Sequence, residues 1–195
     1  MLAYVFWHRP ADPGGAEEYE QATEAFHRSL ARTPPVGMRG SAAYRVPDAP
    51  WLDGPGYEDW YLLEDFTALG VLNEAAVGRG HRTPHDRVAR RYGAGAGALY
   101  ALIEGEGAAP GAAPGSAAPA TWVARPPGSP ERAIGDLLGD GMDPSCASLW
   151  RRLLVLGPAS EYCLTAPEAS RGVSETRLPQ GWSARTVARE LLLRT

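Results

Sequence analysis

Residues 2–8 are LAYVFWH, a run that predicts a β-strand covered on both sides. Successive side chains of a strand point to opposite faces, so the faces carry alternate residues: Tyr4, Phe6 and His8 on one, Ala3, Val5 and Trp7 on the other. Both sets are largely apolar or aromatic, which is typical of a strand with a layer of structure against each face. We therefore expect helices against one face and the interior of a barrel against the other.

The segments after this strand predict a βαββαβ unit over residues 1–104. Residues 16–31 have the apolar spacing of an amphipathic helix, with acidic residues at its start and arginines at its end. The remaining elements are, in order, strands at 40–46 and 57–63, a helix from Asp65 to about Val77, a short helix after Thr83-Pro84 and a strand at 98–103. This order predicts an α+β protein whose first half is ferredoxin-like.

A low-complexity segment divides the chain. Residues 105–119 are GEGAAPGAAPGSAAP, which offers no large apolar side chain for burial, so we expect a flexible tether that is dispensable for folding. Residues 120–195 then predict a second, shorter ferredoxin-like half, with a helix near 130–138 and a strand at 149–156. The last segment, 184–193, has helical propensity where the topology requires a strand, and both alternatives remain open.

The two halves also share short sequence similarities in corresponding places. The matching stretches are AYVFWHRP (3–10) with PATWVARP (119–126), and EDWYL (58–62) with SEYCL (160–164). Aligning the two Arg-Pro pairs places Phe6 opposite Trp122. We therefore expect these two aromatic side chains to occupy equivalent, buried positions.

Composition excludes several classes of protein. The 195 residues are 44% hydrophobic and carry a formal charge of −4 without a basic cluster, so we expect neither nucleic acid nor a membrane as a partner. All 19 basic residues are arginine, and the missing lysine excludes a Walker lysine, a pyridoxal Schiff base and a Ser-x-x-Lys nucleophile. No run approaches the roughly 20 apolar residues of a membrane span. The N-terminal run lacks the basic region of a signal peptide, and two cysteines suit a reducing cytoplasm, so a cytoplasmic location is expected.

Three local motifs have simpler structural interpretations. His81 and His85 have a metal-like spacing, but Pro84 lies between them and starts a helix, which favours a polar loop and helix cap over a metal site. The glycines of Gly93-x-Gly-x-Gly97 precede a strand instead of the helix that a phosphate site needs, and predict a flexible turn. Ser41 lacks the surroundings of a nucleophile, so serine hydrolase chemistry has no support.

His8 and Asp59 are the candidate acid-base pair. In the predicted unit the first and third strands are antiparallel neighbours, which brings His8 close to Glu58 and Asp59. Strand alternation puts these acids on opposite faces, and we choose Asp59 because Tyr61 continues its face; Glu58 is the alternative. A carboxylate beside an imidazole is either a proton-transfer pair or a satisfied polar contact, and both readings stand at this point.

Two βαββαβ units with aromatic-rich strands resemble the dimeric α+β barrel superfamily, which includes antibiotic-biosynthesis monooxygenases, EthD-like proteins and haem-degrading enzymes. The resemblance rests on the order of elements over most of the chain. It implies two sheets that face each other across a cavity, here supplied by a tandem repeat within one chain. Some members carry a functional histidine near the end of the second helix, which is the region of His81 and His85. The glycine- and arginine-rich stretch before them interrupts the helix, so we expect no cofactor and no metal; haem binding through His81 or His85 is the alternative that stays open.

These observations predict a small-molecule-binding α+β barrel, monomeric or homodimeric. It would be a cofactor-independent enzyme, monooxygenase- or isomerase-like, acting on an aromatic or polyketide-like ligand. The candidate catalytic residues are His8 and Asp59, and the candidate ligand-binding residues are Tyr4, Phe6, Tyr44, Tyr61 and His85. The alternative is a non-catalytic structural or assembly protein whose barrel is filled by its own side chains. A cavity of several hundred Å³ with convergent polar groups favours the enzyme, and a filled interior favours the scaffold.

Overall fold

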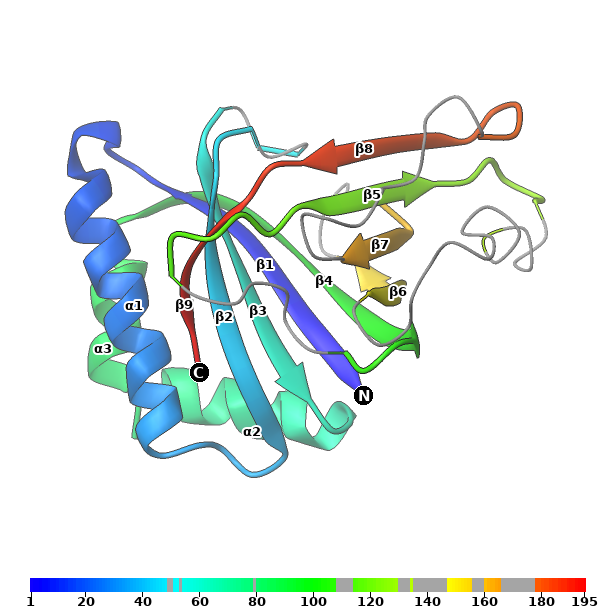
Figure 1. Ribbon diagram of the computed structural model, residues 1–195. Helices are drawn as coiled ribbons and strands as arrows, with labels where there is room; N and C mark the ends of the chain where they lie inside the picture. The colour runs from blue at the N-terminus through cyan, green and yellow to red at the C-terminus, as the bar shows by residue number, and fades with distance from the viewer. Residues whose placement is uncertain are drawn as a thin grey trace.

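The computed structural model describes residues 1–48, 51–52, 54–78, 80–107, 114–129, 134, 147–155, 160–165 and 178–195. Within these residues the chain has an α+β fold, in which nine antiparallel strands form one sheet in the order β8-β5-β7-β6-β4-β1-β3-β2-β9. Three α-helices lie together against one part of this sheet (Figure 1). No helix in the described part of the chain is long and apolar enough to cross a membrane.

The elements of the first half follow one another as the sequence predicts. They are β1 (Leu2–Pro10), a 3-10 turn η1 (Pro13–Gly15), α1 (Ala16–Arg32), β2 (Met38–Val46), β3 (Gly56–Leu63), α2 (Phe66–Val77), α3 (Arg82–Ala89) and β4 (Tyr92–Glu104). β1 lies between β3 and β4, and His8 is directly opposite Tyr57 in the β1–β3 ladder. The predicted antiparallel pairing of the first and third strands is therefore confirmed.

The second half contributes five strands. They are β5 (Ala120–Ala124), β6 (Ser148–Val155), β7 (Tyr162–Thr165), β8 (Ser183–Val187) and β9 (Glu190–Arg194). β6 pairs with β4, and β9 pairs with β2 at the other edge of the sheet. The segment 184–193 is thus extended, because pairing with β2 and burial of Leu191 and Leu192 outweigh its helical propensity. Apart from Ile134, the helix expected near 130–138 lies outside the described residues.

One face of the sheet, which we call the indole face, is filled by aromatic side chains. Its largest buried residues are Trp7, Trp60, Trp122, Trp150, Tyr44 and Tyr100, each less than 2% exposed. Trp7 of β1 contacts Trp122 of β5 with ring centroids 5.1 Å apart, although these strands are not neighbours in the sheet. The sheet therefore bends over and packs against itself through this face. The indole face is therefore filled by the chain's own side chains.

The opposite face of the first half, which we call the helix face, carries Tyr4, Phe6, His8, Asp59 and Tyr61. Phe6 is only partly buried there, whereas Trp122 is fully buried on the indole face. The expectation that these two residues are equivalent is wrong. The Arg-Pro alignment puts side chains of opposite faces in register, and a shift of one residue is enough to move a strand side chain to the other face.

The glycines at 93, 95 and 97 lie inside β4 and do not form the turn that we expected. They are needed because β1 approaches closely. A Cβ atom on Gly95 would lie 2.6 Å from the carbonyl oxygen of Trp7 and 2.9 Å from the ring of Phe6. Small residues at these positions leave room for the aromatic rings of the helix face.

Part of the predicted tether is hydrogen-bonded to the sheet. Residues 108–113 lie outside the described residues, but the amide of Gly115 donates to Leu191 (2.7 Å) and the amide of Ala118 donates to Arg189 (3.0 Å). Ala118 is buried in the indole face. Any shortening of the tether should therefore be confined to residues 108–113.

Candidate functional site

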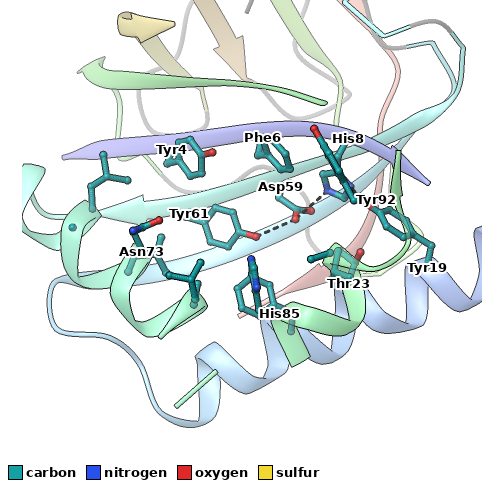
Figure 2. Close-up of a pocket in the computed structure, with 18 of the residues that line it drawn as sticks. Tyr4, Phe6, His8, Tyr19, Thr23, Asp59, Tyr61, Asn73, His85 and Tyr92 are labelled. Atoms are coloured by element: carbon teal, nitrogen blue, oxygen red, sulfur yellow. Dashed lines mark hydrogen bonds and ion pairs between the residues drawn. The ribbon is translucent and has the colours of Figure 1, made fainter. Parts of the chain in front are cut away.

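A cavity of about 730 Å³ lies between the helix face and the three helices. Figure 2 shows aromatic rings from β1, β3 and β4 along one wall, with residues of the helices across from them. The wall residues from the sheet are Tyr4, Phe6, His8, Asp59, Tyr61 and Tyr92, and the helices add Tyr19, Phe26, Leu69, Leu72, Asn73, His85 and Val88, among others. None of the described lining residues is an arginine. The cavity is therefore suited to an uncharged, largely apolar ligand.

Strand register brings the sheet residues of the cavity together. Phe6 is opposite Asp59 and Tyr4 is opposite Tyr61 in the β1–β3 ladder, so alternate residues of both strands share the helix face. Their rings lie nearly parallel along the wall, with interplanar angles of 18° for Tyr4 and Phe6 and 24° for Tyr4 and Tyr61. A row of aligned rings offers a flat ligand repeated stacking contacts.

His8 and Asp59 are in contact, as the sequence predicts. The Nε2 atom of His8 lies 3.1 Å from Oδ2 of Asp59, and the side chains are 1% and 5% exposed. The other ring nitrogen, Nδ1, shares a hydrogen bond of 2.7 Å with the hydroxyl of Tyr19 on α1. The alternative acid, Glu58, lies on the indole face. The contact is a finding, whereas its catalytic role remains a prediction.

His27 is part of the same cluster and was missed in the sequence. Its Nε2 atom lies 3.2 Å from Oδ2 of Asp59, and its ring stacks on Tyr61 at 5.1 Å with an interplanar angle of 9°. The hydroxyl of Tyr61 donates to the same Oδ2 atom at 3.0 Å. A signal was present, because Tyr19, Thr23 and His27 recur every fourth residue and so form one row on the predicted helix.

Asp59 is held ionised by its neighbours. Burial opposes ionisation of this carboxyl group, but the imidazoles of His8 and His27 outweigh burial and lower its pKa well below the ordinary value. Burial, and secondarily the charge of Asp59, raises the pKa values of Tyr4, Tyr19 and Tyr61. The three hydroxyl groups therefore keep their protons at neutral pH and can act as donors.

Two buried polar atoms of this cluster have no hydrogen-bond partner among the described residues. They are Nε2 of His8, which is near Oδ2 of Asp59 but not aligned for a hydrogen bond, and Oδ1 of Asp59. Unsatisfied buried polar atoms are costly and uncommon in folded proteins. Both residues also line the cavity.

The other predicted site residues divide between the two faces. Tyr4, Phe6, Tyr61 and His85 line the cavity. Tyr44 does not, since strand alternation places it on the indole face, where the guanidinium carbon of Arg189 lies 4.3 Å from the centre of its ring. This placement corrects the expectation that Tyr44 would meet the ligand with the others.

His81 and His85 do not converge. His81 is buried and joins helices, with its Nδ1 2.8 Å from the hydroxyl of Ser29 and its Nε2 3.0 Å from the carbonyl oxygen of Thr33. His85 instead packs against Phe26 at the cavity. Among the described residues no group of three or more His, Cys, Asp or Glu could hold a metal ion.

A second buried ionic cluster occupies the indole face. Glu58 pairs with Arg189, and it accepts hydrogen bonds from the indole nitrogens of Trp7 (2.8 Å) and Trp60 (2.5 Å). Both charged side chains are 1% exposed or less. Every oxygen of Glu58 has a partner, although Nη2 of Arg189 has none among the described residues. With both charges paired inside a filled core, this cluster has the character of a structural ion pair.

Several solved structures share this fold at low sequence identity. A candidate monooxygenase from Fusobacterium nucleatum aligns over 99% of this chain and 93% of its own, with a TM-score of 0.71 and 10% identity. An anthrone oxidase-like protein aligns over 100% and 92% with a TM-score of 0.58 and 11% identity. A candidate monooxygenase from Lactobacillus acidophilus aligns over 98% and 95% with a TM-score of 0.58 and 11% identity. No protein-family model and no curated protein matches the sequence.

Proposed function

We propose that the chain is a monooxygenase-like enzyme that binds a neutral aromatic or polyketide-like compound in the cavity and removes a proton from it. The observation that carries the proposal is the His8–Asp59 pair at the wall of an aromatic-lined cavity, with two buried polar atoms that no described residue satisfies. The fold neighbours described as candidate monooxygenases support the same class of reaction.

The charges of the cluster suit proton acceptance. Asp59 contacts two imidazoles, but one carboxylate compensates only one imidazolium. A second proton enters the buried cluster readily only when a new negative charge forms beside it. Deprotonation of a bound ligand supplies that charge, because the ligand anion and the new imidazolium form together.

His8 is the proposed acceptor because, unlike His27, it lines the cavity. When its Nδ1–H donates to the oxygen of Tyr19, Nε2 carries the lone pair that takes the proton. The new N–H charge then lies 3.1 Å from Oδ2 of Asp59, which stabilises it. His8 would thus be the base, and Asp59 the carboxylate that faces the new imidazolium charge.

The simplest balanced reaction is oxidation of an activated methylene, as in an anthrone: R₂CH₂ + O₂ → R₂C=O + H₂O. Proton removal leaves a stabilised carbanion, which transfers electrons to O₂ and forms a C–O bond as a peroxide anion. The peroxide anion takes back a proton and becomes a hydroperoxide. Loss of water then gives the ketone. The substrate itself is the reductant, so this chemistry needs no separate electron donor. One fold neighbour is described as anthrone oxidase-like, which agrees with this choice of substrate.

Polar groups around the cavity can orient such a ligand. Tyr4 keeps its proton because burial raises its pKa, so its hydroxyl can donate to a ligand carbonyl or to the oxyanion that develops on deprotonation. Asn73 of α2 and His85 of α3 lie across from the sheet wall (Figure 2). Together these polar groups would fix one orientation of the ligand, while the aromatic side chains of the sheet wall stack on the ligand's rings.

We also propose that the chain is a tandem of two ferredoxin-like units, 1–104 and 120–195, joined by the segment 105–119. Each set of four strands has the same arrangement: β4-β1-β3-β2 in the first and β8-β5-β7-β6 in the second, so that the fourth, first, third and second strands lie in that order. The bent sheet, packed on itself through the indole face, is then an α+β barrel formed within one chain.

The alternative function is a non-catalytic scaffold, and the filled indole face supports it, because side chains occupy the barrel interior. A scaffold has no need of an open cavity beside the helices. Binding of a flat, uncharged ligand there is therefore the property that separates the two proposals.

The test uses 1,8-dihydroxyanthrone as probe, with oxygen uptake and quinone absorbance measured above the rate in buffer. We expect turnover by the protein, and a loss of about 10²–10⁴-fold in kcat for His8→Gln, since positioned proton transfer contributes that much. His81→Gln is the matched control: it makes the same substitution at a buried histidine outside the cavity, and should retain turnover. Turnover by His8→Gln equal to that of the unaltered protein would exclude His8 as the base. Absence of both turnover and binding would favour the scaffold.

A further inference from the structure

Gly70 of α2 differs from every other glycine that the structure describes. It is the fifth of the twelve residues of α2, inside the helix, where glycine is less favourable than every residue except proline. Its φ lies outside the left-handed range, and a Cβ atom there would have no atom within 4 Å beyond its chain neighbours and the adjoining helix backbone. Each of the other described glycines either has a positive φ or would bring its Cβ within 4 Å of another atom. Neither backbone conformation nor close packing therefore requires glycine at position 70.

Gly70 lies at the mouth of the cavity. It belongs to a stripe of α2 residues at helical spacing, all of which line the cavity and are exposed: Phe66, Gly70, Asn73 and Val77. Phe66 and Val77 are 62% and 47% exposed, so this stripe is a rim between the cavity and solvent. Gly70 is its one position without a side chain, which leaves a gap in the rim between Phe66 and Asn73.

The α2 rim lies at the end of the cavity away from His8. Leu69 and Leu72 of α2 belong to the same apolar cluster as Tyr4. Tyr4 is four residues before His8 on β1, which is about 13 Å along an extended strand. Asn73 likewise lies towards the Tyr4 end of the wall, away from His8 (Figure 2). A ligand held at His8 therefore meets the rim with its distal part.

We propose that Gly70 forms a notch through which a substituent on an outer ring of the ligand passes from the cavity towards solvent. The inference rests on the proposed function, in which the reacting methylene lies beside His8. That methylene is in the central ring of an anthrone, so only one outer ring extends from His8 towards the rim. The cavity of about 730 Å³ is in the upper part of the range for drug-sized ligands, about 300–1,000 Å³, which leaves room for a group attached to that ring.

The side chains of the rim indicate the chemistry of this substituent. Phe66 and Val77 are apolar, Asn73 offers a neutral amide, and none of the three carries a charge. The rim therefore favours an uncharged chain of several carbon atoms over a charged group. The tip of the chain reaches solvent, where it is free to be polar.

Gly70→Leu tests the notch, because a side chain at this open position fills the gap in the rim. Thr67→Leu is the matched control, since Thr67 is also exposed on α2 but does not line the cavity. Calorimetric titration compares anthraquinone with 2-pentylanthraquinone. Because each buried CH₂ contributes about a fourfold factor in affinity, Gly70→Leu should weaken binding of the pentyl compound at least about 10-fold and that of anthraquinone less than about 2-fold. Thr67→Leu should change neither. Equal weakening of both compounds by Gly70→Leu, or weakening of neither, would overturn the proposal.

Two further outcomes separate the notch from the proposed oxidation. If the two compounds bind as expected but 1,8-dihydroxyanthrone is not oxidised, the notch stands and the oxidation fails. Failure of the unaltered protein to bind either compound would overturn both. Thermal denaturation needs no ligand, and both leucine variants should melt at or above the temperature of the unaltered protein, because leucine favours a helix. A lower melting temperature for Gly70→Leu alone would show that α2 needs this glycine for packing, and would overturn the notch.

Discussion

Glu58 and Asp59 are adjacent on β3, both are buried, and their surroundings are opposite in kind. Glu58 faces the indole face, where Arg189 and two indole nitrogens occupy its oxygens. Asp59 faces the cavity, where His8, His27 and Tyr61 contact its Oδ2 atom, and Oδ1 has no hydrogen-bond partner in the described part of the chain. One residue of strand alternation thus separates a closed ion pair from an open, titratable cluster.

The difference shows how burial alone misleads in choosing a catalytic acid or base. When both oxygens of a carboxylate are paired within a filled core, the carboxylate stabilises one arrangement of strands. It then has no free oxygen with which to bind a ligand. A carboxylate that keeps one oxygen free beside titratable imidazoles can respond to a ligand's charge. Whether the carboxylate has an oxygen without a partner, and whether a cavity adjoins it, distinguish the two cases.

The largest expected effect comes from breaking the closed pair. Arg189→Met leaves Glu58 as an uncompensated buried charge, which should lower the free energy of unfolding by about 3–5 kcal/mol, measured by chemical denaturation. The double variant Glu58→Gln with Arg189→Met removes both charges and should recover part of that loss.

Arg45→Met is the control for this prediction. Arg45 also pairs with two acids, Glu20 and Glu190, but its side chain is 44% exposed, so the loss should be only about 0–1 kcal/mol. Equal losses for Arg189→Met and Arg45→Met would mean that the Glu58 pair is not the closed structural unit described above.

The next largest effect is a pH dependence of the unfolding free energy that comes from Asp59 and its histidine neighbours. The pKa of Asp59 is lower in the folded protein than its ordinary value of 3.8, so its stabilisation is fully present above that value and is lost as the pH falls towards the folded pKa. Asp59→Asn should cost about 2 kcal/mol of unfolding free energy at pH 7. The two stability curves should converge below about pH 3. A difference that stays constant from pH 7 to pH 3 would contradict the ionised state of Asp59.

The smallest expected effect is that of removing one tyrosine hydroxyl, compared between the helix face (Tyr4) and the indole face (Tyr44). Tyr4→Phe removes a hydroxyl at the cavity and should change the unfolding free energy by less than about 0.5 kcal/mol, while weakening anthraquinone binding about 3- to 10-fold through the loss of one hydrogen bond. Tyr44→Phe, on the indole face, should leave the affinity unchanged. Calorimetric titration measures both. If only Tyr44→Phe binds anthraquinone more weakly, the ligand lies against the indole face and not in the cavity, which would contradict the proposed site.

The sequence predicted the helix face better than the indole face. Alternation along residues 2–8 and 57–63 was enough to pair His8 with Asp59, because the ladder geometry of two antiparallel strands is nearly fixed. Tyr44 was misplaced because alternation shows only that it shares a face with Ala42 and Val46. It does not say whether that face meets the helices or the rest of the bent sheet. His27 was overlooked because it lies beside, and not within, the apolar stripe of its helix.

By itself, the sequence determined the order of the elements through residue 104, the choice of Asp59 over Glu58 beside His8, and the absence of lysine chemistry. These depend on local periodicity and on residue types. Only the tertiary structure decided that the space beside the helices is open while the indole face is closed, that residues 184–193 are extended, and that His27 lies beside Asp59. Those outcomes depend on side-chain volumes packed between segments far apart in sequence, and on an edge strand that pairs with residues about 150 positions earlier in the chain.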